Sequence, residues 1–112
     1  MINDHVKTSL DDWLNVRAPG TYLVKVDGDS MEGVGIFSGD MLIVDKAIEA
    51  RPGRVVIAVV NQEPMVKILE VEGRMLVLRS ANPRYPKRYI MENDEFEVWG
   101  VVTHSLRDHA RN

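Results

Sequence analysis

Residues 54–80 have the sequence RVVIAVVNQEPMVKILEVEGRMLVLRS. Within this stretch, three runs rich in β-branched and aliphatic residues (54–60, 65–71 and 74–80) are separated by Asn-Gln-Glu at 61–63 and by Glu72-Gly73. Short apolar runs joined by such turn residues are typical of β-hairpins. The stretch therefore predicts a three-stranded antiparallel meander with residues 65–71 as its central strand.

Similar runs flank the meander at residues 22–26, 41–45 and 97–104, with Gly, Asp, Asn and Pro between them. Evenly spaced short strands with turn residues between them are typical of all-β domains. The predicted fold class is mainly β, a single small domain of twisted antiparallel sheets or a partly open barrel.

The first twenty residues have a different, polar character. Their apolar side chains can form one patch, as a short helix or an arm: Leu10, Trp13, Leu14 and Val16. Ala18-Pro19-Gly20 then breaks the segment. We expect an N-terminal arm at 1–20, a β domain at 21–105 and a C-terminal tail at 106–112.

The composition sets further bounds. One hundred and twelve residues suffice for one domain, and the absence of cysteine removes any disulfide framework. The chain has no run of eighteen apolar residues and its start lacks the layout of a signal peptide. We therefore expect a cytoplasmic protein with no membrane association.

Two residues in this pattern suggest chemistry: Ser30, in the turn Gly28-Asp29-Ser30-Met31, and Lys67, thirty-seven positions later on the predicted central strand. A serine hydroxyl becomes a good nucleophile when a base removes its proton, and lysine can be that base only when its amine is neutral. Burial among aliphatic side chains lowers a lysine pKa. Met65, Lys67 and Leu69 share one face of a strand, which supplies such surroundings.

Each residue also has a simpler interpretation. A serine after Gly-Asp is commonly a turn residue that bonds its own backbone. A lysine in a strand commonly points towards solvent. From the residues alone, these alternatives stay open.

A wider set of motifs favours the catalytic interpretation. The blocks TYLVKVDGDSM (21–31), GDMLIVD (39–45), GRVVIA (53–58) and Val66-Lys67 occur in this order, followed by ANPRYP (81–86) and VWGVVTH (98–104). Together they resemble the LexA/UmuD family of self-cleaving proteins, from about residue 21 to 104. The resemblance implies a serine peptidase with Ser30 as nucleophile and Lys67 as general base.

The same resemblance suggests the rest of the site. Backbone N–H groups of Asp29 and Ser30 are the candidate oxyanion donors, and Gly28 and Met31 are candidate cleft residues. The family cleaves its own chain at an Ala-Gly or Cys-Gly bond well before the serine. Neither pair occurs in this sequence, and twenty-nine residues precede Ser30, so we expect a processed form that lacks its regulatory arm.

In the UmuD branch of the family, the processed form is an accessory subunit of an error-prone translesion DNA polymerase in SOS mutagenesis. The resemblance then implies a homodimer that binds a catalytic Y-family polymerase subunit (UmuC-like) and works with the RecA filament. The alternative is the catalytic and dimerisation domain of a LexA-like or phage-type repressor. A third possibility is a free serine peptidase that acts on other chains.

Other candidate sites are weaker. The net charge is −3, which opposes nucleic-acid binding, and we expect no sequence-specific DNA binding by this chain alone. One basic cluster, interleaved with Tyr85 and Tyr89, could contact a single strand but fits a protein partner better; it comprises Arg79, Arg84, Lys87 and Arg88. His5, His104 and His109 lack metal-ligand spacing, so no metal and no cofactor are expected. Asp40 matches a family motif position, and we interpret it as structural.

Overall fold

The computed structural model describes residues 10, 14 and 19–110. Most of the predicted arm, including Trp13, Val16 and His5, lies outside these residues, so the arm and its apolar patch stay predictions. No helix in the part of the chain that the structure describes is long and apolar enough to cross a membrane.

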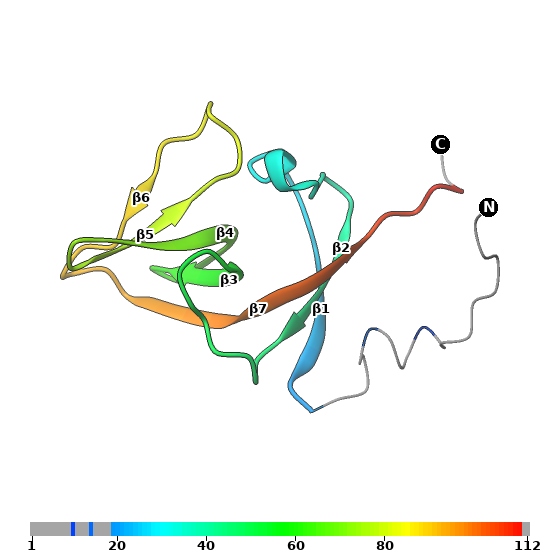
Figure 1. The fold of residues 1–112 in the computed structure, drawn as a ribbon, viewed down its shortest axis with the longest axis horizontal. Helices are drawn as coiled ribbons and strands as arrows, with labels where there is room; N and C mark the ends of the chain where they lie inside the picture. Colours follow the sequence, from blue (N-terminus) through cyan, green and yellow to red (C-terminus); the bar gives the residue numbers. More distant parts are fainter. Residues whose placement is uncertain (1–9, 11–13, 15–18, 111–112) are drawn as a thin grey trace, which may run out of the picture.

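Seven antiparallel strands form one open sheet in the order β1-β2-β7-β3-β4-β5-β6 (Figure 1). The strands are β1 (Thr21–Lys25), β2 (Met41–Asp45), β3 (Val55–Val60), β4 (Glu63–Glu72), β5 (Met75–Arg79), β6 (Arg88–Tyr89) and β7 (Phe96–Leu106). A short 3-10 helix, η1 (Glu32–Val34), lies between β1 and β2. The predicted mainly β fold is confirmed, whereas η1 and β6 were not predicted because each has only two or three residues.

The meander at 54–80 forms as predicted. Strand β4 lies between β3 and β5, with Val60 opposite Glu63 and Glu72 opposite Met75. The first turn is the two-residue loop Asn61–Gln62, and both residues have a positive φ, of 51° and 69°. That geometry matches the right-handed twist of the two strands and keeps the hairpin tight.

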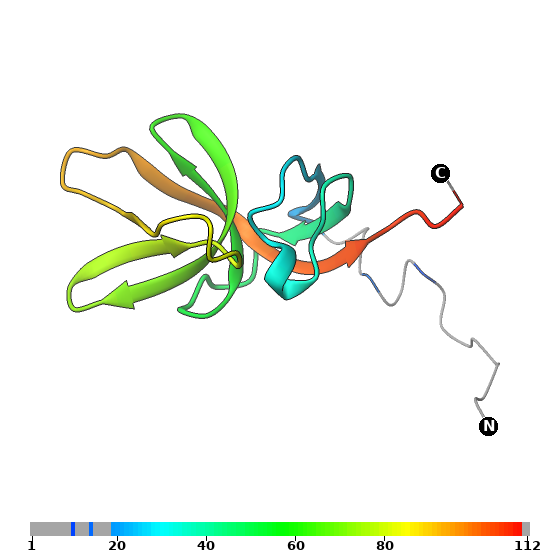
Figure 2. The same ribbon diagram turned by 90° about the horizontal axis from the view of Figure 1, so that it is seen from above.

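Strand β7 joins the meander to the β1–β2 pair (Figures 1 and 2). Two register shifts, near Trp99 and Thr103, let β7 bend as it passes from β3 to β2. Gly100 lies at the crossing, where a Cβ atom would come within 2.6 Å of Val44 Cγ1. Only glycine leaves room for this close approach.

Two apolar clusters stabilise the two halves. One is centred on β2 and the loop between β1 and β2 and includes Met31, Leu42 and Val44. The other is centred on β3, β4 and β5 and includes Val56 and Leu78. Residues along β4 alternate between the clusters. Val66 and Ile68 belong to the first cluster, whereas Met65 and Leu69 belong to the second, so the alternation predicted around Lys67 is present.

Candidate active site

Ser30 lies in the loop between β1 and β2. The base of this loop is closed by two backbone bonds: Val26 N–H donates to Asp40 O (2.9 Å) and Gly39 N–H donates to Val26 O (2.8 Å). Met31 is almost fully buried, at 1% exposure, and anchors the turn in the apolar cluster of β2. Because its neighbour is anchored, Ser30 is presented at the surface of a fixed turn.

Lys67 comes from β4, opposite Val56 of β3. The pairing of β4 with β5 begins one residue later, at Ile68. Lys67 is therefore paired with β3 on one side, whereas its other side is not paired with β5.

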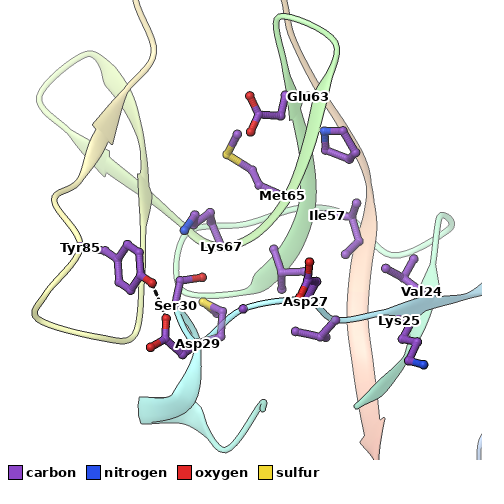
Figure 3. A pocket seen from close by; sticks show the side chains of 15 residues that line it. Val24, Lys25, Asp27, Asp29, Ser30, Ile57, Glu63, Met65, Lys67 and Tyr85 are labelled. Atoms are coloured by element: carbon purple, nitrogen blue, oxygen red, sulfur yellow. Dashed lines mark hydrogen bonds between the residues drawn. The ribbon is translucent and has the colours of Figure 1, made fainter. Parts of the chain in front are cut away.

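These two segments enclose a pocket of about 410 Å³ (Figure 3). All the residues predicted for the site line it: Gly28, Asp29, Ser30, Met31 and Lys67. Figure 3 shows Asp29 and Ser30 on one segment and Lys67 on another, with Tyr85 at one side of the pocket. Tertiary structure thus brings together residues that are thirty-seven positions apart.

The Lys67 amine is half-buried and its surroundings are specific. Burial lowers the pKa of Lys67 below its ordinary value. Its Nζ donates a hydrogen bond of 2.7 Å to Ser80 Oγ and lies 5.6 Å from the centroid of the Tyr85 ring. The simpler interpretation, a lysine that points towards solvent, is therefore wrong for Lys67.

The Ser30 hydroxyl makes no hydrogen bond with any residue of the described part of the chain, so it does not act as a turn serine that bonds its own backbone. Nor does any hydrogen bond within residues 19–110 join Ser30 Oγ to Lys67 Nζ. The two groups share the pocket, and the amine is held by Ser80.

The loop from Ser80 to Tyr85 contributes side chains that the sequence did not single out as site residues. Asn82 Nδ2 donates to the Asp29 backbone carbonyl (3.0 Å), Arg84 donates to the Asp29 carboxylate (2.6 Å), and the Tyr85 hydroxyl donates to the same carboxylate. The Tyr85 hydrogen bond, followed by the Arg84 charge, holds the pKa of Asp29 below its ordinary value. The resemblance had identified this loop, but its contacts with Asp29 arise from a fold that joins residues more than fifty positions apart.

The basic cluster is neutralised by carboxylates. Each of its four members forms an ion pair: Arg79 with Glu70, Arg84 with Asp29, Lys87 with Glu72, and Arg88 with Asp94. Positive charges that are offset in this way attract a phosphate backbone weakly. The pairing argues against a nucleic-acid surface here, and a contact with a protein partner stays a prediction.

Asp40 has a structural role, as predicted. It is 1% exposed, accepts a hydrogen bond from Phe37 N–H (2.8 Å), and pairs with Arg107 at 3.0 Å. Among the described residues, no three His, Cys, Asp or Glu side chains gather as a metal site would require.

Comparison with known proteins places this geometry in context. The Peptidase S24-like family matches residues 2–103. The chain is 42% identical to Protein MucA of Salmonella typhimurium over 96 residues, which are 84% of this chain and 65% of that protein. It is 37% identical to the LexA repressor of Bordetella avium over 109 residues, which are 96% of this chain and 51% of that protein.

A third relative, Protein SamA of Salmonella typhimurium, is 39% identical over 104 residues, which are 89% of this chain and 70% of that protein. The chain thus spans between about half and 70% of the length of these relatives. The resemblance to LexA and UmuD proteins is confirmed, and the chain belongs to the Peptidase S24-like family.

Proposed function

We propose that this chain is a serine peptidase domain in which Ser30 is the nucleophile and Lys67 is the general base. One observation carries the proposal: Ser30 and a half-buried lysine with a lowered pKa line the same pocket. A neutral amine has two N–H donors and one lone pair. Donation to Ser80 Oγ steadies the amine, and the lone pair stays available for the Ser30 proton.

The reaction that fits this arrangement is attack on a peptide carbonyl. Ser30 Oγ forms a bond to the carbonyl carbon while its proton passes to Lys67 Nζ. The oxyanion that develops is stabilised by backbone N–H groups at the Ser30 turn, for which Asp29 and Ser30 are the candidates. The C–N bond then breaks as the protonated lysine gives its proton to the departing amine, which leaves an ester on Ser30. Water, deprotonated by Lys67, hydrolyses this ester and releases the second product.

The test supplies the peptide bond from outside, because the 112 residues contain neither Ala-Gly nor Cys-Gly. The chain is incubated at alkaline pH with a peptide that contains an Ala-Gly bond, and the products are identified by mass spectrometry. We expect slow cleavage at that bond, abolished in Ser30→Ala and in Lys67→Ala. Cleavage that continues in both variants would refute the dyad.

For the biological role, we propose a processed, UmuD′-like accessory subunit of a translesion polymerase in the SOS response. This role involves a cytoplasmic homodimer that binds a catalytic Y-family subunit and the RecA filament. Support comes from the similarity to MucA, a UmuD homologue, and to SamA. The dyad would then serve in maturation, and the mature domain would bind partners.

A repressor domain is the second candidate. The observation in its favour is coverage, since the match to the LexA repressor spans 96% of the chain against 84% for MucA. Co-expression with a Y-family polymerase subunit, followed by affinity purification, separates the two candidates. Recovery of a stoichiometric complex supports the accessory subunit, whereas recovery of the chain alone favours the repressor domain.

A further inference from the structure

The peptide unit between Asp29 and Ser30 is fixed by hydrogen bonds to its carbonyl group. Its carbonyl oxygen accepts a hydrogen bond from Asn82 Nδ2 at 3.0 Å and a longer one, of 3.4 Å, from Glu32 N–H. The carbonyl of Asp29 and the N–H of Ser30 belong to one planar trans unit and point in opposite directions. Whatever fixes the carbonyl therefore also fixes the direction of the Ser30 N–H.

The Ser30 N–H has no acceptor among residues 19–110. It belongs to a residue that lines the pocket, beside the hydroxyl that would attack. An oriented backbone donor without a partner, next to a nucleophile, is what an oxyanion site requires. A hydrogen bond accepted by the carbonyl also polarises the peptide unit and strengthens its N–H as a donor.

Asn82 is itself held in the orientation that this role needs. Its Oδ1 accepts a hydrogen bond from Arg84 N–H at 3.1 Å, which leaves Nδ2 facing the Asp29 carbonyl. The reverse orientation would place Oδ1 against a carbonyl oxygen and Nδ2 against an N–H, and both contacts would be repulsive.

The loop that carries Asn82 is fixed to the Ser30 turn at two further points. Gly33 N–H, in η1, donates to Ala81 O at 2.7 Å. Arg84 and Tyr85 hold the Asp29 side chain by its two carboxylate oxygens. Figures 1 and 2 both show the loop between β5 and β6 next to η1.

We propose that Asn82 is a positioning residue of the oxyanion site. Its hydrogen bond to the Asp29 carbonyl directs the Ser30 N–H into the pocket. This inference rests on the proposed function, because it assumes that Ser30 attacks. A side chain of the β5–β6 loop thereby orients a backbone donor of the β1–β2 loop.

The test uses a fluorophosphonate probe, which mimics the tetrahedral intermediate. Ser30 Oγ forms a bond to phosphorus, the P–F bond breaks, fluoride leaves, and the hydroxyl proton passes to Lys67. The phosphoryl oxygen takes the place of the oxyanion. The rate of labelling at Ser30, followed by mass spectrometry across pH, therefore reports both the base and the oxyanion site.

Two variants address Asn82. Asn82→Ala removes the donor and the acceptor, whereas Asn82→Asp keeps an oxygen for Arg84 N–H and replaces the donor by a negatively charged acceptor oxygen. We expect both variants to label about tenfold more slowly on the alkaline plateau, the effect of one oriented hydrogen bond. The pH midpoint of Asn82→Ala should stay at the wild-type value, because the Asn82 side chain bonds Asp29 and Arg84, whereas the Lys67 amine bonds Ser80.

The matched control is Thr103→Val, which removes another side-chain donor to a backbone carbonyl, the Ile43 carbonyl at 3.3 Å. Thr103 does not line the pocket, so this variant should label at the wild-type rate even where its thermal midpoint falls. Wild-type labelling by Asn82→Asp or Asn82→Ala would overturn the inference and leave the dyad intact. Absence of labelling in the wild-type chain, or equal labelling in Ser30→Ala, would overturn the proposed function and this inference with it.

Discussion

Lys67 Nζ and Ser80 Oγ lie 2.7 Å apart, in a hydrogen bond that joins the middle of β4 to the first residue after β5. Ser80 is 6% exposed, so this hydroxyl is an acceptor largely screened from water. The bond fixes the position of the lysine amine inside the pocket, whereas burial lowers its pKa.

The first prediction concerns pH. A base whose pKa is lowered by burial is neutral over a wider range, so labelling of Ser30 should rise with pH through the folded pKa of Lys67. That midpoint should lie below the ordinary lysine value of 10.5. Lys67→Arg keeps a donor for Ser80 but stays protonated, and it should lower the rate about a hundredfold or more. A midpoint at or above the ordinary value would contradict the burial argument.

The same shift has a consequence for stability. The folded state disfavours charged Lys67, so below the lowered pKa this group destabilises the fold, and the penalty disappears as pH rises past the ordinary lysine value. Lys67→Met should therefore be at least as stable as the wild-type chain at neutral pH. Urea unfolding of the two chains at matched pH measures the difference, and a large loss of stability in Lys67→Met would refute the argument.

Ser80→Ala tests the positioning bond. An oxygen accepts a hydrogen bond more strongly from an ammonium than from a neutral amine, so its removal should move the pH midpoint downward. The plateau rate should fall by about three- to tenfold because the amine loses its anchor. Ser80→Thr retains the hydroxyl and is the control that should keep the wild-type midpoint. An upward shift in Ser80→Ala would mean that the hydroxyl acts in some other way.

Gly33→Ala tests the contact between η1 and the β5–β6 loop. A Cβ at residue 33 would lie 2.5 Å from the Ala81 carbonyl oxygen, so the loop must move away. We expect a loss of about 1–3 kcal/mol in unfolding free energy, together with slower labelling of Ser30. Val34→Ala, at an exposed neighbouring position, should change neither. Unchanged labelling in Gly33→Ala would show that the loop does not control the site.

The Asp40–Arg107 pair predicts behaviour in acid. The Arg107 hydrogen bond, followed in effect by the bond from Phe37 N–H, holds the pKa of Asp40 below its ordinary value of 3.8. The contribution of ionised Asp40 to the free energy of unfolding is therefore complete above pH 3.8, and it is lost as pH falls through the folded pKa of Asp40. Arg107→Ala should lower the free energy of unfolding at neutral pH, because it leaves the buried Asp40 carboxylate without its partner.

The acid transition of Arg107→Ala should also begin at a higher pH than that of the wild-type chain, since a buried carboxylate without its partner protonates more readily. Arg51→Ala breaks the exposed pair with Glu49 and is the control, with an expected change of about 0.5 kcal/mol or less. Equal acid transitions in the wild-type chain and Arg107→Ala would contradict the assignment.

The sequence of 54–80 determined the meander and the place of Lys67 on its central strand, because hairpin turns and alternating apolar residues are local signals. Local signals also placed Ser30 on a turn. They could not find β6, which has two residues, or η1, because so short an element carries no periodicity.

Only the tertiary structure decided which side chains surround Ser30 and Lys67. Ser80, Asn82 and Tyr85 reach the site because β4 and β5 pair side by side and the loop that follows returns to η1. Contacts such as Asn82 to Asp29 span fifty-three positions, and no periodicity encodes a distance of that kind. The sequence supplied the two candidate residues, Ser30 and Lys67, whereas the packing of two loops decided what holds the Lys67 amine and which way the Asp29–Ser30 peptide points.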